Sequence, residues 1–300
     1  MAEKLSWKAA LFWIFGSVIV FSGTGYGVYF YFLSPHRVQK EEERFSINAI
    51  VQTGPEKEAL KTAYLAELME LSCDKGQNLF TFDVKKAEEK LLLSPLIKRA
   101  RVRRIRPGSL YVDYEVRHPV AILHDYENMG IDQEGYLLPL HPFFPTQGMP
   151  EIYLGLFPAA SEEKSAGWPN PLKGREFSLS LQLLQYLSVP EFARIFSVKR
   201  IDVSKAYSKS IGKREIVLWV EEAVRMAHKK GESLCVFPQF LRLNAKDFEQ
   251  EISNFIVLRE KMLKDYQKQL ATQIITTPIV TFSPRIIDFR IPELAFIQEK

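Results

Sequence analysis

Residues 9–33 read AALFWIFGSVIVFSGTGYGVYFYFL, an apolar stretch of 25 residues without a charge. An uncharged run of about 18 residues or more predicts a membrane-spanning helix, because about 20 residues at roughly 1.5 Å each cover the hydrocarbon core. Aromatic residues lie near both ends, as is typical of the two membrane interfaces: Trp7, Trp13, Tyr26, Tyr29, Tyr31 and Phe32. The sequence therefore predicts one transmembrane helix over residues 9–33.

Two alternatives compete with this interpretation. A cleaved signal peptide has an apolar core of about 7 to 15 residues followed by a small-residue cleavage site, and neither feature fits this stretch. A buried helix of a soluble domain is apolar on one stripe, whereas this segment is apolar on every face. The flanking charges barely decide the orientation, and long C-terminal domains translocate largely regardless of them. We expect residues 1–8 to be a cytoplasmic tail and the chain after the helix to lie outside the cytoplasmic membrane.

The composition excludes several classes of function. Among 300 residues, 40 are basic and 36 acidic, and this balance is too even to indicate a nucleic-acid binder. Cys73 and Cys235 lie far apart without zinc-site spacing, and whether they form a disulfide stays open. The five histidines show no metal-ligand spacing, and no nucleophile elbow or phosphate-binding glycine loop occurs. The sequence predicts no enzyme, no cofactor and no metal site.

After a charged connector at residues 34–44, the chain shows the pattern of a small α+β domain. Phe45–Gln52 alternates like a half-buried strand, with Ile47, Ala49 and Val51 on one face, and Gly54 and Pro55 end it. The elements expected next are helices at 56–71 and 84–93, the second capped by Asp83, and strands at 99–105 and 110–116. Two helices would then cover one face of a three-stranded sheet.

Several motifs in this region resemble the POTRA domain of the FtsQ/DivIB cell-division proteins. They are Asn78-Leu-Phe-Thr-Phe-Asp83, Ser94-Pro-Leu-Ile97, Pro107-Gly-Ser-Leu-Tyr-Val112 and Glu115-Val-Arg-His-Pro-Val-Ala121. The last is similar to the family's Glu-Arg-x-Pro-x-Ala, with Val116 inserted. Downstream, Ile131-Asp-Gln-Glu-Gly135 and Met149-Pro-Glu-Ile-Tyr-Leu-Gly155 resemble motifs of the family's β domain. The resemblance implies a POTRA domain at 45–121 and an FtsQ-type β domain at 122–300.

The second domain is predicted to mix strands with flanking helices. After a proline-rich loop from His141 to Gly174, we expect a helix at 178–187 and strands at 197–203, 215–220 and 234–237. The stretch 223–232 reads as a basic, polar interruption, and the pattern at 216–220 leaves open which face is core. Asn244 would cap a long helix at 245–270, and short apolar runs follow at 279–282, 286–290 and 294–297.

By resemblance, the chain is a bitopic scaffold of the bacterial septum, held in the inner membrane at the division site. Its implied partners are the FtsB-like and FtsL-like single-span proteins, which connect it to septal peptidoglycan synthesis. The family docks a partner strand at the end of its β domain, where Ile287-Asp-Phe-Arg290 matches a family motif. The candidate partner-binding residues are therefore Arg290, Ile291, Leu294, Ala295, Phe296 and Ile297. Alternatively, this terminal stretch packs on the domain or frays.

The run from Lys98 to Arg106 is the most basic stretch of the chain. Its residues Arg101, Arg103 and Arg104 are candidates for docking an acidic partner. The alternatives are an anionic-lipid or nucleic-acid patch, or charges that protect a sheet edge from pairing. Nucleic acid is not expected for an exported domain.

Two other classes of protein remain as alternatives to a division scaffold. POTRA modules also occur in outer-membrane protein assembly and secretion factors, but those chains end in a membrane β-barrel of many alternating strands. The long helix expected at 245–270 argues against one. An anchored hydrolase is the third possibility, and the missing catalytic motifs argue against it.

Overall fold

A computed structural model describes residues 7–41, 43–53, 59–72, 76–156 and 170–299 of the chain. The chain divides into two compact units, Met1–Val116 and Arg117–Lys300. Parts of the predicted features lie outside the described residues: the tail residues 1–6, Gly54 and Pro55, Cys73, and 157–169 of the proline-rich loop. Cys235 is a buried free thiol.

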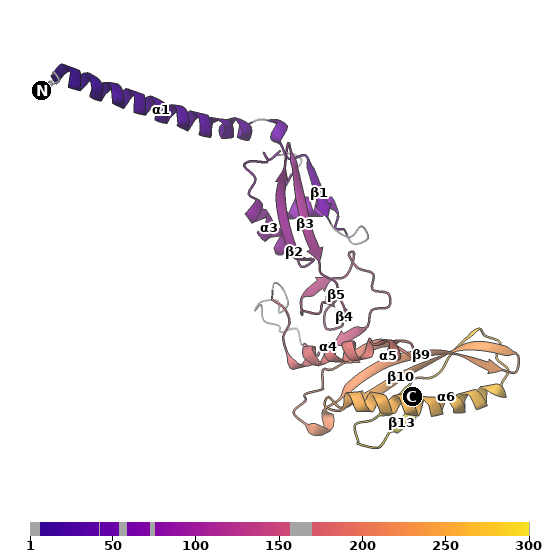
Figure 1. Cartoon of the computed structure of the whole chain (residues 1–300). Coiled ribbons are helices and arrows are strands. Elements are labelled where there is room, and N and C mark those ends of the chain that lie inside the picture. Colours follow the sequence, from indigo (N-terminus) through magenta and orange to yellow (C-terminus); the bar gives the residue numbers. More distant parts are fainter. Residues whose placement is uncertain (1–6, 42, 54–58, 73–75, 157–169, 300) are drawn as a thin grey trace. The chain divides into compact units, whose positions relative to one another are not determined.

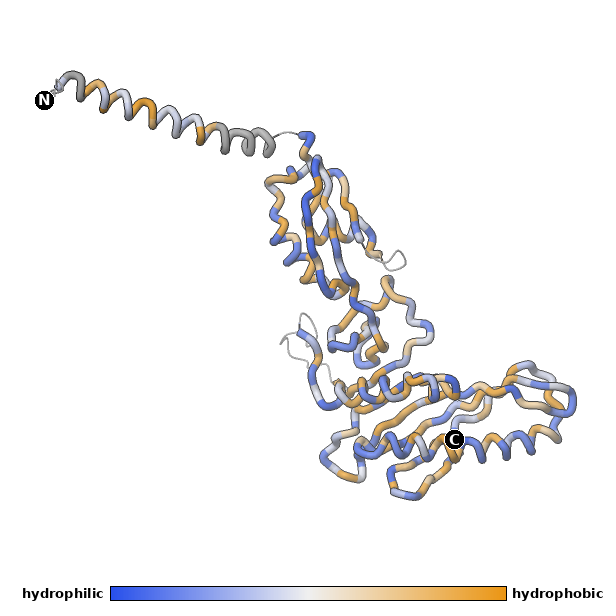
Figure 2. Tube along the Cα trace, viewed as in Figure 1, coloured by the Kyte–Doolittle hydropathy of each residue, from blue (hydrophilic) through white to orange (hydrophobic). Residues whose placement is uncertain are grey.

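The chain begins with the helix α1, Trp7–Glu41. Within it, Leu11–Phe30 is long and apolar enough to cross a membrane, which suggests a single-pass membrane protein. Figure 2 colours this part of α1 orange to pale. The helix is longer than predicted, because it includes most of the residues expected to form the connector. At its end, Gln39, Lys40 and Glu41 are polar but favour the helical conformation, so the helix continues through them. A short 3-10 turn, Glu43–Phe45, follows.

The first unit has the predicted order of strand, helix, helix, strand, strand (Figure 1). Its elements are β1 Ala49–Thr53, α2 Thr62–Leu68, α3 Val84–Leu92, β2 Ile97–Ile105 and β3 Ser109–Val116. The sheet order is β1-β3-β2, with β1 parallel and β2 antiparallel to β3. Helix α3 contacts β2, and α2 contacts both α3 and β1.

The buried face of β3 was predicted correctly, whereas that of β1 was not. Leu110, Val112, Tyr114 and Val116 are buried, as their alternation indicated. In β1, Val51 is 46% exposed and Ala49 is also exposed, and Ile50 and Gln52 are the partly buried residues. Hydrogen bonds explain why Gln52 points toward the inner face: it accepts one from the Tyr114 hydroxyl (2.9 Å) and donates one to Thr62 Oγ1 (3.2 Å).

The predicted element boundaries in this unit shift in two places. The first strand begins at Ala49, since Phe45 belongs to the 3-10 turn, and the first helix begins only at Thr62. The cap of α3 is as predicted, because Asp83 Oδ1 accepts a hydrogen bond from the Lys86 N–H at 3.1 Å. The unit boundary falls after Val116, and Ala121, the expected last residue of the first domain, opens a strand of the second sheet.

The second unit is built on a ten-stranded sheet of order β13-β12-β10-β9-β8-β7-β4-β5-β6, with β11 also paired to β10. The first strands are β4 Ala121–Leu123, β5 Met129–Ile131, β6 Leu137–Pro139, β7 Glu151–Tyr153 and β8 Ser197–Asp202. The later ones are β9 Ile216–His228, β10 Gly231–Leu243, β11 Ile279–Thr281, β12 Arg285–Asp288 and β13 Phe296–Glu299. The helices are α4 Arg175–Leu187, α5 Pro190–Ala193 and α6 Phe248–Ala271, with a 3-10 turn at Ile211–Lys213.

Helices α4 and α6 share one hydrophobic core with the sheet. Leu183 of α4 and Ile252 and Phe255 of α6 are fully or almost fully buried there, together with Leu218 of β9 and Leu241 of β10. The inward face of β9 is therefore Ile216, Leu218 and Val220, which answers the question that the sequence left open. The mixed α+β class predicted for the whole chain is confirmed.

Two predictions for this unit were wrong. The stretch 223–232 is not an interruption, because β9 and β10 pair continuously from Ile216↔Leu243 to His228↔Gly231 and this stretch forms the end of their hairpin. Figure 1 shows α6 running alongside this hairpin. The long helix begins at Phe248 rather than Ala245, and Asn244 does not cap it; Asn244 Oδ1 instead accepts the Lys246 N–H at 3.1 Å.

Candidate partner-docking edge

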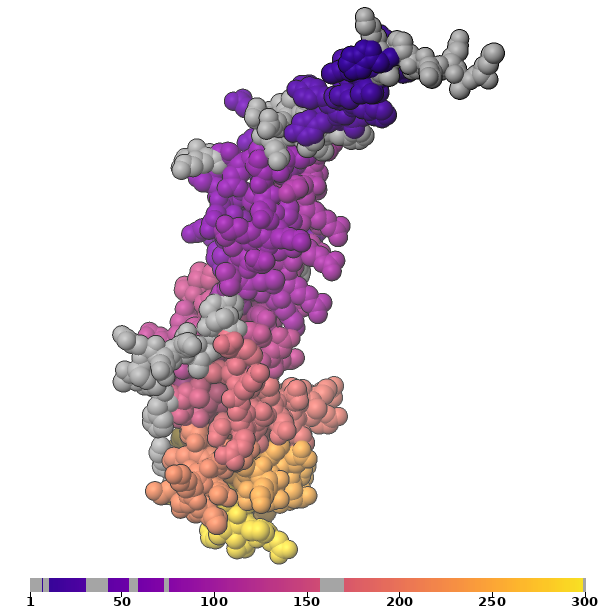
Figure 3. Space-filling view, turned by 90° about the vertical axis from the view of Figure 1, so that its left-hand side faces the viewer, coloured from indigo at the N-terminus to yellow at the C-terminus, as the bar shows by residue number. Residues whose placement is uncertain are grey.

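The last strand of the chain forms one end of the large sheet. Strand β13 pairs antiparallel with β12, from Arg285↔Glu299 to Asp288↔Phe296. Among the described residues no strand pairs with its other side, so β13 offers a row of unpaired backbone N–H and C=O groups. In Figure 3, the yellow C-terminal residues form part of the molecular surface.

The predicted apolar residues lie together at this edge. Ile291 is 50%, Leu294 54%, Phe296 56% and Ile297 45% exposed, and Ala295 is exposed as well. Exposed large apolar side chains beside an open strand edge are typical of a site that another chain covers.

The predicted residue Arg290 is held within the unit. Its Nε and Nη2 donate to the two carboxylate oxygens of Asp288 at 2.9 and 2.7 Å, and its Nη1 lies 3.7 Å from Glu215. Asp288 also accepts the Arg290 backbone N–H and lies 3.0 Å from Arg242 Nη1. Although burial favours the neutral acid, the hydrogen bonds from Arg290 hold the pKa of Asp288 below its ordinary value. Arg290 therefore fixes the start of the terminal loop.

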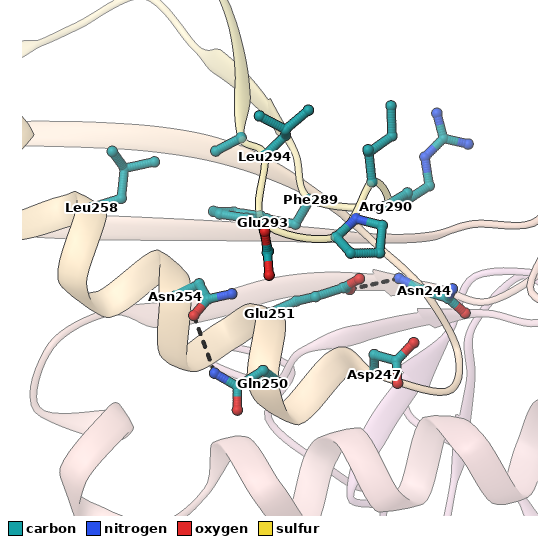
Figure 4. Close-up of a pocket in the computed structure, with 13 residues that line it drawn as sticks. Asn244, Asp247, Gln250, Glu251, Asn254, Leu258, Phe289, Arg290, Glu293 and Leu294 are labelled. Carbon is teal, nitrogen blue, oxygen red and sulfur yellow. Dashed lines mark hydrogen bonds between the residues drawn. The ribbon is translucent and has the colours of Figure 1, made fainter.

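A groove of about 650 Å³ lies between that loop and the first half of α6 (Figure 4). Polar side chains of α6 line one wall, and Phe289, Leu294 and Leu258 contribute apolar surface. Glu251 projects into it from α6 and accepts the Asn244 backbone N–H at 2.7 Å. Burial, together with the charges of Asp247 and Asp288, raises the pKa of Glu251 to about 7. Apart from its place in the predicted helix, no sequence pattern singles out this carboxyl group.

The basic residues of the first unit lie on the edge strand β2, one of the alternatives that the sequence left open, and they point to both faces of the sheet. Arg101 and Arg103 point to the face opposite the helices, opposite Asp113 and Tyr111 of β3. Arg104 points to the other face, where its Nη2 donates to the Phe82 carbonyl at 2.6 Å. Docking of an acidic partner at these arginines stays a prediction.

The edge of β2 is blunted by a residue that the sequence did not single out. Glu88 of α3 accepts the Val102 backbone N–H at 2.8 Å with Oε1. A side chain that satisfies an outward N–H removes one site where a foreign strand would pair. The free edge at β13 thus contrasts with a protected one at β2.

The two motifs at the start of the second unit meet in one cluster, in which Arg117 and Asp132 are buried. Arg117 Nη1 lies 2.8 Å from Asp132 and 2.9 Å from Glu134, and the guanidinium stacks on the Tyr136 ring at 3.6 Å. Asp132 also accepts the backbone N–H groups of Glu134 and Tyr136, so it shapes the turn in which Gly135 has φ +90°. These motif residues therefore stabilise the fold of the second unit.

Among the described residues, no group of three or more His, Cys, Asp or Glu side chains is arranged to hold a metal ion. Residues 45–113 match the family model described as "POTRA domain, FtsQ-type". This match covers the first unit after its helix and does not extend to the sheet that carries the candidate edge. No curated protein matched the chain.

Proposed function

The FtsQ-type POTRA domain supports an FtsQ/DivIB-like assignment of the chain, and from this premise we propose that it is a bitopic scaffold of the bacterial division machinery. Its task is to bind other proteins rather than to catalyse a reaction. The observation that carries the proposal is the order of an apolar N-terminal helix followed directly by this domain type. In this arrangement α1 anchors the chain in the inner membrane and the N-terminus is cytoplasmic. The part of the first unit that follows α1, and the whole second unit, lie in the periplasm at the division site.

The proposed contact is strand addition at β13. A partner strand that pairs with the free side of β13 satisfies its unpaired N–H and C=O groups and extends the sheet by one strand. Ile291, Leu294 and Phe296 supply apolar surface beside the new strand. The ion pairs of Arg290 with Asp288 and Glu215 keep the loop in place before the partner arrives, which lowers the entropic cost of binding.

The proposed partners are FtsB-like and FtsL-like single-span division proteins, the partners implied by the resemblance. Through them the chain connects to septal peptidoglycan synthesis. POTRA modules of outer-membrane assembly factors instead bind unfolded substrates, and the test below distinguishes the two.

The test is co-purification of the full chain, in detergent, with the FtsB-like and FtsL-like proteins of the same cell. Ile297→Pro places a proline in β13, where it removes an N–H and disturbs the strand, so we expect loss of co-purification. Truncation after Ile291 removes the strand and should have the same effect. Ile274→Pro, at an exposed isoleucine after α6 and outside any strand, is the matched control and should keep both partners.

Partner capture that survives Ile297→Pro and the truncation would move the site away from β13. Failure of the unaltered chain to bind either partner, together with binding of unfolded outer-membrane proteins, would overturn the scaffold proposal itself.

A further inference from the structure

The sheet has another open edge on strand β9, which β12 and β10 separate from β13 in the sheet order. Strand β8 pairs with β9 only over Val217–Glu221, whereas β9 continues to His228. Over its last seven residues, 222–228, no strand of the described chain pairs with β9 on the side away from β10.

Two known contacts show which backbone groups face this open side. The Glu221 carbonyl accepts a hydrogen bond from Ser197 Oγ of β8 at 3.3 Å, and the Ala227 carbonyl accepts one from Gln267 Nε2 at 3.1 Å. Outward-facing groups recur at every second residue of an antiparallel strand. The backbone groups of Ala223 and Arg225, which lie between these two positions, therefore face outward too, and no described residue pairs with them as a strand.

The side chains along this segment leave the edge accessible and positively charged. Ala223 and Ala227 are small and exposed, and Arg225 is exposed as well. Within the described chain, Arg225, Lys229 and Lys230 have no ion pair within 4 Å. The two acids at the base of the segment are already neutralised: Glu221 lies 3.2 Å from Lys199, and Glu222 pairs with Arg259.

The segment is also rigid. Met226, Cys235 and Phe237 of the hairpin pack with Tyr266 and Leu270 of α6 in a separate small core. An edge that is held in extended form before binding costs a partner little ordering entropy.

We propose that Ala223–Ala227 is a strand-addition site for an extended acidic segment of a partner protein. The unpaired N–H and C=O groups of Ala223 and Arg225 supply the ladder, and Arg225, Lys229 and Lys230 select for acidic side chains. A second copy of this chain is a poor occupant, because antiparallel pairing of two such edges would bring Arg225 opposite its own copy. This site is independent of β13.

The test measures binding of a fluorescent peptide of alternating glutamate and valine to the full chain in neutral detergent. Its control is a peptide of the same charge in which the valines are replaced by proline, which cannot complete a ladder. We expect binding of the first peptide alone, weakening with added salt, and slower amide hydrogen exchange at Ala223 and Arg225 in its presence.

Arg225→Glu should weaken binding about fivefold or more, because an attractive charge becomes repulsive. Lys213→Glu reverses an exposed charge on a turn outside the sheet and should leave affinity within about twofold. Truncation after Ile291 should not affect the peptide, which separates this site from β13. Equal binding of the proline peptide, an unchanged affinity of a folded Arg225→Glu variant, or binding of vesicles containing phosphatidylglycerol without peptide binding would overturn the proposal.

Discussion

Glu251 is a carboxyl group buried beneath the terminal loop, and its ionisation is linked to the stability of the second unit. Its pKa is raised from 4.5 to about 7, chiefly because burial penalises the charged form. Between these two values the folded state binds more protons than the unfolded state, so stability falls as pH rises through this window. Above about pH 7 the carboxylate is charged in both states, and its full cost is present.

We therefore predict that Glu251→Gln makes the second unit more stable at pH 8 by up to about 3 kcal/mol, with a much smaller difference at pH 5. The neutral amide can still accept the Asn244 N–H. Urea unfolding at both pH values measures the effect. Glu249→Gln, at an exposed carboxylate of the same helix, is the control and should change stability little at either pH. A Glu251→Gln variant with the same pH dependence as the native chain would contradict this assignment.

At the residue scale, the structure places the apolar docking candidates and the charged one differently, and docking at any of them stays a prediction. Ile291, Leu294, Phe296 and Ile297 were chosen by their place after a motif, and the structure exposes all of them at an open edge. Arg290 belongs to the motif itself, and its guanidinium group is hydrogen-bonded to the Asp288 carboxylate two residues earlier. A motif shows that a residue matters to the family without showing whether it serves the fold or the partner.

At the scale of elements, the structure treats its sheet edges differently. The Glu88 carboxylate accepts a hydrogen bond from the outward-facing N–H of Val102 on β2. The outward N–H groups of Ala223 and Arg225 on β9 have no such acceptor among the described residues. Natural sheets blunt the edges that must not pair and leave open those that bind.

We predict that Glu88→Ala exposes the β2 edge to other chains. Hydrogen exchange of the Val102 amide should become about tenfold faster or more, because its hydrogen bond is lost. Sedimentation of the full chain in detergent should show concentration-dependent association that the native chain lacks. Glu89→Ala, at the exposed neighbouring position of α3, is the matched control and should do neither. Unchanged exchange at Val102 would mean that Glu88 does not protect this edge.

The hairpin shows why sequence patterns missed part of the fold. The sequence predicts a strand at 234–237 that stops before Pro238, because proline is not expected inside a central strand. In the structure β10 continues, because Pro238 falls between the stretch paired with β11 (Leu234–Val236) and the one paired with β12 (Gln239–Arg242), where no ladder bond is needed. That gap depends on strands about 40 residues later in the chain, so local patterns do not reveal it.

At the scale of the whole molecule, the predicted succession of membrane helix, small α+β domain and larger β domain agrees with the structure. The exact boundary differs because the motif Glu115–Ala121 serves both units. Val116 is buried on β3, whereas Arg117 pairs with Asp132 and Ala121 opens β4. Because this motif contributes residues to two hydrophobic cores, the sequence alone makes its last residue look like the end of the first domain.

The proposed scaffold requires the second unit, and the part of the first unit that follows α1, to lie on the same side of the membrane, opposite the N-terminal tail. We predict that Lys209→Cys, at an exposed position of the second unit, reacts with a membrane-impermeant maleimide in intact spheroplasts. Ser6→Cys, before α1, should react only after lysis, because an apolar helix with no charge from Leu11 to Phe30 separates the two positions. Both variants carry Cys73→Ser to limit background, and the native Cys235 is buried.

The reverse labelling pattern would place the units in the cytoplasm and would leave the β13 edge out of reach of periplasmic partners. Labelling of Lys209→Cys in a protein that has lost Ser6 would instead favour a cleaved signal peptide, and the chain would then act without an anchor.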